Sequence, residues 1–213
     1  MLDKIKDLLH ITLKRSELSV YDKIDNLFET LDDDIIVVKI GTDLSDYKDV
    51  LLNTTEVIRK EIKEECGFIM PAVVIKGNLS MQENEFCICI RGIEKETRFV
   101  VPVEDEVREE FYDSLKSVIY GNLNTIFTNE ITEKYINTVQ KRNNRLVWNI
   151  TSVLSVIDIK TILSDIILKG KSISNINYIF EKIGEHILSD CDYTEHPKHH
   201  NPHNIAKQIA KSL

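Results

Sequence analysis

Hydrophobic residues near the start of the chain recur at steps of three and four positions. This spacing places them on one face of a helix, so two amphipathic helices are predicted within residues 1–33. The apolar stripes consist of Leu2, Ile5, Leu8, Leu9 and Leu13, and then Val20, Ile24, Leu27, Phe28 and Leu31. Each stripe needs a surface to cover, either in its own domain or on a partner. The candidate interaction residues here are Leu2, Ile5, Leu9, Leu27 and Phe28.

A strand and a helix are predicted next. Residues 35–40 are apolar except for Lys39, which indicates a strand. Residues 46–65 have helical spacing, because Leu51, Val57, Ile58 and Ile62 recur at roughly three- and four-residue steps. Gly67 follows as a left-handed C-cap, a conformation that costs glycine little.

Three more strands are expected after this helix. Pro71 favours extended backbone, so residues 72–76 are predicted to form a buried strand, followed by a turn at residues 77–78. Residues 85–91 alternate between two faces, with Phe86, Ile88 and Ile90 on one and Cys87 and Cys89 on the other. This period of two indicates a half-buried strand. Residues 98–103 are predicted as the last strand.

The rest of the chain has helical patterns. Helices are predicted at residues 104–127, 129–141, 157–169 and 174–189, with Ser174 as an N-cap for the last. Residues 190–204 read as a loop, followed by a short terminal helix. The predicted fold class is α+β, with a mixed sheet and packed helices in residues 35–127 and an all-helical part afterwards. The predicted divisions are residues 1–33, 34–127, 128–189 and 190–213.

Composition and charge narrow the functional classes. The 213 residues are 42% hydrophobic and carry a net charge of −8, which disfavours binding to nucleic acid or an anionic membrane. No run approaches the ~18 apolar residues of a membrane helix, and the start lacks the layout of a signal peptide. None of the four cysteines has the spacing of a paired metal-binding or disulfide motif, so we expect them to be reduced thiols. These features predict a cytoplasmic protein.

No catalytic or cofactor motif is found. Residues 170–172 read Gly-Lys-Ser, but a phosphate-binding loop requires glycine where Asp165 stands. Four histidines lie in residues 195–203, although two prolines and the lack of a cysteine partner favour a solvated linker over a metal site. Cys87 and Cys89 share a strand face that we expect to be partly covered, with Cys66 elsewhere. We therefore predict no enzyme, no cofactor and no metal.

Two features leave alternatives open. Trp148 is expected to pack between helices, and the alternative is an exposed interface anchor. The helices in residues 157–189 also resemble a helix-turn-helix, which would make the protein a nucleic-acid-binding regulator. The second of these helices offers only Lys182 against Glu181 and Glu185, a poor surface for reading a groove.

Residues 65–92 resemble the cytoplasmic domain of the flagellar and type III secretion export-gate family, FHIPEP. In that family a helix leads into G-F-x-x-P-x-V-x-I-x-x-N-L and then N-E-Y/F with alternating apolar residues up to a glycine. The matching positions are Gly67, Phe68, Pro71, Val73, Ile75, Asn78, Leu79, Asn84, Glu85, Phe86, Ile88, Ile90 and Gly92. Residues 166–176 are similar to the family's L-L-x-E-x-V-S-I-R-D-L, and residues 118–123 to V-I-x-T-H-L. The resemblance covers roughly residues 35–187.

The resemblance implies a non-enzymatic scaffold for protein partners in secretion, with self-association as one form of partnership. Family domains assemble into a ring under the membrane and receive chaperone–substrate complexes. The chain departs from this pattern, because only about 25 residues separate Gly92 from the V-I-x-T-H-L segment, where the family inserts a subdomain that forms the chaperone cleft. Gly121 and Asn122 replace the threonine and histidine of T-H-L. We expect a shortened relative that reaches a membrane only through a separate partner protein.

Overall fold

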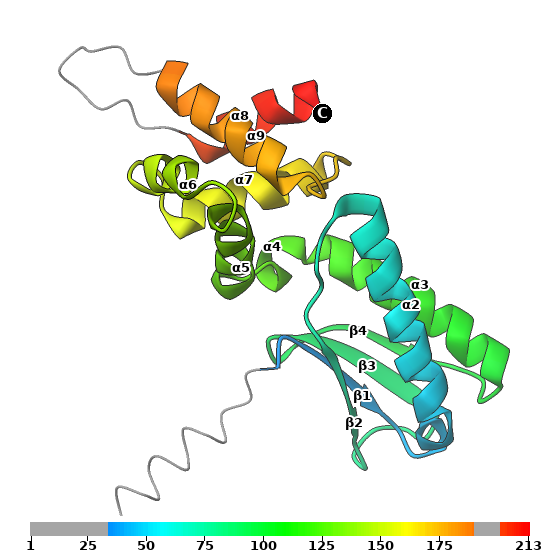
Figure 1. The fold of residues 1–213 in the computed structure, drawn as a ribbon. Coiled ribbons are helices and arrows are strands. Elements are labelled where there is room, and N and C mark those ends of the chain that lie inside the picture. Colours follow the sequence, from blue (N-terminus) through cyan, green and yellow to red (C-terminus); the bar gives the residue numbers. More distant parts are fainter. Residues whose placement is uncertain (1–33, 190–200) are drawn as a thin grey trace, which may run out of the picture. The chain divides into compact units, whose positions relative to one another are not determined.

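The computed structural model describes residues 34–189 and 201–213, which belong to one compact unit. The predicted helices in residues 1–33, and with them Leu2, Ile5, Leu9, Leu27 and Phe28, lie outside the described residues. A four-stranded mixed sheet with packed helices is followed by further helices (Figure 1). The predicted α+β fold class is confirmed. The finer division at residues 127 and 189 stays a prediction.

The sheet has the strand order β2-β1-β3-β4. Its strands are β1 (Ile36–Ile40), β2 (Val73–Gly77), β3 (Glu85–Ile90) and β4 (Ile93–Phe99). β1 runs parallel to β2 and antiparallel to β3, and β3 and β4 form an antiparallel hairpin. A parallel pair needs a crossover connection, which the helix between β1 and β2 provides.

The prediction that residues 72–76 form a buried strand is wrong in one respect. β2 lies at the edge of the sheet and is half-buried, because only β1 pairs with it. β3 pairs with β1 and β4, so the two strands on either side of the 77–78 turn are not neighbours.

The last strand also differs from its prediction. β4 starts at Ile93, directly after a tight turn in which Arg91 and Gly92 have φ values of 48° and 75°. Residues 100–103 lie outside β4, between this strand and the next helix. Val100 is buried and still donates its backbone N–H to the carbonyl oxygen of Asn84 at 3.0 Å, whereas Val101 and Val103 are exposed.

Two long helices cover one face of the sheet (Figure 1). A 3₁₀ turn, η1 (Asp43–Tyr47), leads into α2 (Lys48–Cys66), and α3 (Glu104–Gly121) packs beside α2. Their apolar faces meet the inward side chains of the strands. Phe86 of β3 makes an edge-to-face contact with Phe111 of α3, with ring centroids 5.7 Å apart.

The remaining described helices follow α3. They are α4 (Leu123–Ile126), α5 (Asn129–Gln140), α6 (Asn144–Thr151), α7 (Val156–Leu168), α8 (Ile176–Ser189) and α9 (Pro202–Ser212). The single helix predicted for residues 104–127 is interrupted at Asn122, and α6 was not predicted. None of the helices in the described part of the chain has the length and hydropathy needed to cross a membrane.

Side-chain caps explain where several helices begin. Ser155 and Asp158 form a reciprocal capping box at α7, and Thr128 caps α5. The prediction of Ser174 as the cap of α8 is off by one residue. The backbone N–H of Tyr178 donates to the side chain of Asn175 at 3.4 Å.

A stack of aromatic rings joins the helix–strand connection to α5. Phe127 stacks between Phe68 and Tyr135, with centroid distances of 5.1 Å and 5.8 Å. Gly67 ends α2 with a φ of 74°, as predicted, and a Cβ there would lie 2.4 Å from the backbone nitrogen of Ser174. Glycine is required at this position both for its conformation and for the close approach of a second segment.

Candidate interaction surface

The candidate surface centres on Trp148 in the short helix α6. The Asn143 side chain caps this helix by accepting a hydrogen bond from the N–H of Leu146 at 3.1 Å. Val147 and Ile150 are buried, whereas the Trp148 side chain is 68% exposed. The prediction that Trp148 packs between helices is therefore wrong. Its role as an interface anchor stays a prediction.

Trp148 lies on one side of an open groove between α6 and α8. The groove has a volume of about 500 Å³ and is mostly apolar. We call it the Trp148 groove. Its lining includes Trp148, Ile150, Val153, Gly184, Ile187 and Leu188. Val153 and Leu188 are exposed by 47% and 68%, so the apolar character reaches the surface.

A glycine allows the two helices that form the groove to approach closely. A Cβ on Gly184 would lie 2.9 Å from a methyl carbon of Leu146. Leu146 in turn packs against the core. The groove is therefore shaped by a tight contact between α6 and α8 at its base, which favours a preformed surface.

Acidic residues of α8 line the same groove. Glu181 and Glu185 are both lining residues, and Lys182 contacts Glu185 at 2.6 Å. The hydrogen bond to Glu185 raises the pKa of Lys182 above its ordinary value. Because its charge is already matched within α8, Lys182 adds little positive potential for nucleic acid. The groove therefore combines apolar lining residues with acidic ones on α8.

A second cavity lies beside the connection from α2 to β2. It has a volume of about 600 Å³ and is lined by Gly67, Ile69, Pro71 and Tyr135, among others. The Ile69 side chain is 57% exposed there. Its charged lining residues are mostly basic, namely Arg59, Lys63 and Lys134 against Glu130. This cavity differs in charge from the Trp148 groove.

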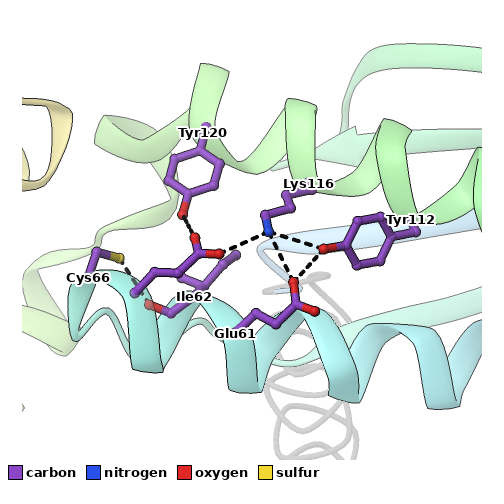
Figure 2. A network of polar contacts seen from close by, with 7 residues as sticks. Glu61, Ile62, Cys66, Tyr112, Lys116 and Tyr120 are labelled. Carbon is purple, nitrogen blue, oxygen red and sulfur yellow. Dashed lines mark hydrogen bonds and ion pairs between the residues drawn. The ribbon is translucent and has the colours of Figure 1, made fainter. Parts of the chain in front are cut away.

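A network of polar side chains ties α2 to α3 (Figure 2). The Lys116 ammonium of α3 donates to Glu61 at 3.0 Å and to Glu65 at 3.1 Å. Tyr112 donates to Glu61, and Tyr120 donates to Glu65 at 2.8 Å. These tyrosine hydrogen bonds, followed by those of Lys116, hold the pKa values of both glutamates below their ordinary range. The network is a contact between helices, in which two carboxylates share one ammonium and each also accepts a tyrosine hydroxyl.

The histidine-rich segment is only partly described. Residues 195–200 lie outside the described residues, whereas His203 lies in the first turn of α9, which begins before the predicted end of the loop. The Nδ1 of His203 is 2.6 Å from a carboxylate oxygen of Asp165 on α7. His203 thus contacts the body of the protein, and the histidine metal site stays untested.

Residues 11–107 match the model of the FHIPEP family. The resemblance inferred from the sequence motifs is therefore confirmed. The match includes all four strands, α2 and the beginning of α3. It places the strongest motif, residues 65–92, within the matched segment.

Curated relatives are similar over a shorter stretch. The flagellar biosynthesis protein FlhA of Buchnera aphidicola subsp. Acyrthosiphon pisum is 34% identical over 67 residues. A second FlhA, from Buchnera aphidicola subsp. Schizaphis graminum, has the same identity over the same length. The matched stretch covers 29% of this chain and 10% of the length of each relative.

Solved structures are similar over much more of the chain. The Chlamydia pneumoniae CdsV protein has a TM-score of 0.70 at 12% identity, covering 86% of this chain and 67% of that one. CdsV in its complex with CdsO has a TM-score of 0.61 at 14% identity and covers 72% and 61%. The nonameric EscV cytosolic domain from a type III secretion system has a TM-score of 0.63 at 12% identity and covers 82% and 62%. This chain shares the fold of these domains.

Sequence reasoning missed much of the Trp148 groove. Val153 and Leu188 were not singled out, and α6 was not predicted. The signal was present, because Asn143 is a good N-cap and Leu146, Val147 and Ile150 follow at helical spacing. That pattern turns Trp148 away from the core. The five candidates in residues 1–33 lie outside the described residues and stay predictions.

Proposed function

We propose that the protein is a non-enzymatic, cytoplasmic scaffold of a type III or flagellar protein export apparatus, and that it binds a protein partner through the Trp148 groove. The fold shared with cytosolic export-gate domains supports the class. The exposed Trp148 beside a preformed apolar groove is the observation that carries the binding role. Exposed tryptophans in such settings are enriched among residues that dominate binding energy.

Both self-association and a different export protein fit this proposal. One similar structure is nonameric, and another is a complex of CdsV with CdsO. The acidic lining residues Glu181 and Glu185 favour a partner segment that carries basic residues next to apolar ones. We propose an export component of that chemistry as the partner of the groove. Self-association would use other surfaces.

The test measures binding to the purified protein products of flagellar and type III export genes. Light scattering gives the oligomeric state, and titration with each purified product gives its affinity. We expect Trp148→Ala to weaken partner binding at least tenfold, whereas Phe99→Ala, which removes a 57% exposed ring on β4, leaves it unchanged. A strict monomer that binds none of these products would overturn the proposal. Equal effects of the two variants on binding would show that the Trp148 groove is not the binding surface.

A further inference from the structure

Three side chains with metal-binding atoms converge on the sheet face opposite to α2 and α3. Cys87 and Cys89 lie two residues apart on β3 and therefore point to the same side. Glu94 lies on β4 directly opposite Cys89. The sulfur atoms and a carboxylate oxygen of these residues all lie within 4.8 Å of one another.

A β-bulge brings the carboxylate to this position. The pairing of β3 with β4 shifts after Ile88, which faces Glu96, so that Cys89 faces Glu94. Without the shift, Lys95 would stand opposite Cys89. Bulges re-aim side chains in this way and often lie next to functional sites. Here the bulge places an anionic ligand, instead of a cation, beside the two thiols.

The distance between the two sulfur atoms fits tetrahedral coordination of a metal ion. The two Sγ atoms are 3.8 Å apart. Two thiolates bound to a tetrahedral Zn²⁺ with bonds of about 2.3 Å lie about 3.8 Å from each other. The Glu94 oxygen lies within 4.8 Å of both sulfur atoms, and movement of this exposed side chain would bring it to the bond length of about 2.0–2.2 Å that zinc carboxylates have.

The surroundings combine buried sulfur with an accessible carboxylate. Cys87 and Cys89 are 3% and 0% exposed and pack with Val37, whereas the Glu94 side chain is 64% exposed. The Lys39 ammonium lies 3.4 Å from Glu94, so the carboxylate already attracts a cation. Lys39 is 35% exposed and has a flexible stem, which lets it move into solvent.

We propose that Cys87, Cys89 and Glu94 form a binding site for a thiophilic divalent cation of the Zn²⁺ class, with a water molecule as the fourth ligand. On binding, each thiol gives up its proton to solvent and forms one sulfur–metal bond. Lys39 loses its contact with Glu94. The proposal is independent of the export role.

Cobalt titration under reducing conditions tests the proposal. Co²⁺ bound by thiolates gives a ligand-to-metal charge-transfer band, which histidine ligands do not give. We expect one equivalent of Co²⁺ to produce the band in the full chain and Zn²⁺ to displace it. The Cys87→Ser/Cys89→Ser variant should lose the band. The control Cys66→Ser/Cys191→Ser replaces the other two of the four cysteines, keeps both β3 thiols and should retain the band.

Two single variants guard against misfolding, because both side chains are at least one-third exposed. Glu94→Gln should weaken Co²⁺ binding, and Lys39→Met should strengthen it by removing the competing cation. Circular dichroism confirms that each variant is folded. A folded wild-type protein without the band, a band that survives loss of Cys87 and Cys89, or unchanged affinity in both single variants would overturn the proposal.

Discussion

The hydroxyl of Tyr135 donates a hydrogen bond to the carbonyl oxygen of Gly67 at 2.8 Å, across 68 residues of sequence. The same hydroxyl accepts a hydrogen bond from the backbone N–H of Ile69 at 2.9 Å. One side chain of α5 thus satisfies two backbone groups of the α2–β2 connection. Tyr135 is 8% exposed, and burial raises its pKa to about 12.

Replacing Tyr135 by phenylalanine keeps the stacked ring and removes only the hydroxyl. We expect Tyr135→Phe to lower the free energy of unfolding by roughly 1–3 kcal/mol, because the buried carbonyl of Gly67 and the part-buried N–H of Ile69 lose their partner. Urea unfolding at neutral pH measures the loss. Tyr47→Phe is the matched control, since the Tyr47 hydroxyl donates to the carbonyl of Pro102 near the surface, where water can replace it. Equal losses in the two variants would contradict this account.

Two glycines with nearly equal φ values separate backbone strain from crowding. Gly67 and Gly170 have φ values of 74° and 70°, but only Gly67 has other atoms where a Cβ would lie. We expect Gly170→Ala to cost about 1 kcal/mol and Gly67→Ala at least about 3 kcal/mol. Thermal and urea unfolding of both variants measure the difference. Similar costs would show that the approach of Ser174 to Gly67 does not constrain the fold.

Local patterns predicted the features that depend on neighbours in sequence. The Gly67 cap and the alternation of Phe86, Ile88 and Ile90 could be predicted because each depends on only a few consecutive residues. The edge position of β2 was not, since strand order depends on pairing between distant segments. The approach of Glu94 to Cys89 needs a bulge, which leaves no mark in a period-two pattern.

The predicted helix boundaries were wrong for a related reason. The apolar spacing of residues 104–127 continues across Asn122, although the helix is interrupted there. At Asn122 the side chain donates to the carbonyl oxygen of Val118 at 2.8 Å, a local bond that competes with regular helix. α6 has only eight residues, which is short for a periodicity argument. The candidate site was therefore predicted only through its single tryptophan.

The polar network between α2 and α3 makes the free energy of unfolding depend on pH. Glu61 and Glu65 have lowered pKa values in the folded protein, so their contribution is present above about pH 4.5 and is lost as pH falls through the folded values. We expect unfolding midpoints in urea to drop between about pH 5 and pH 3, and to drop less in Glu61→Gln/Glu65→Gln.

The control for this acid dependence is Glu130→Gln. Glu130 also has a lowered pKa through Lys134, but both side chains lie on α5 and are more than 70% exposed. Replacing Glu130 should change the fall of the unfolding midpoint at acidic pH less than the double variant does, because exposed ion pairs within one helix contribute little to stability. If the unfolding midpoints of the double variant and the wild type fall equally at acidic pH, the network does not cause the loss of stability in acid.

The orientation of α6 can be tested through two adjacent residues. Val147 is 3% exposed and Trp148 is 68% exposed. We expect Val147→Ala to lower the free energy of unfolding by roughly 1–3 kcal/mol and Trp148→Ala to change it by less than about 0.5 kcal/mol. Because Trp148 is the single tryptophan of the chain, its fluorescence reports directly on this site. The emission should be red-shifted and readily quenched by acrylamide in the free protein, and shielded when a partner fills the groove. A blue-shifted, protected emission in the monomer would mean that α6 faces the core with Trp148.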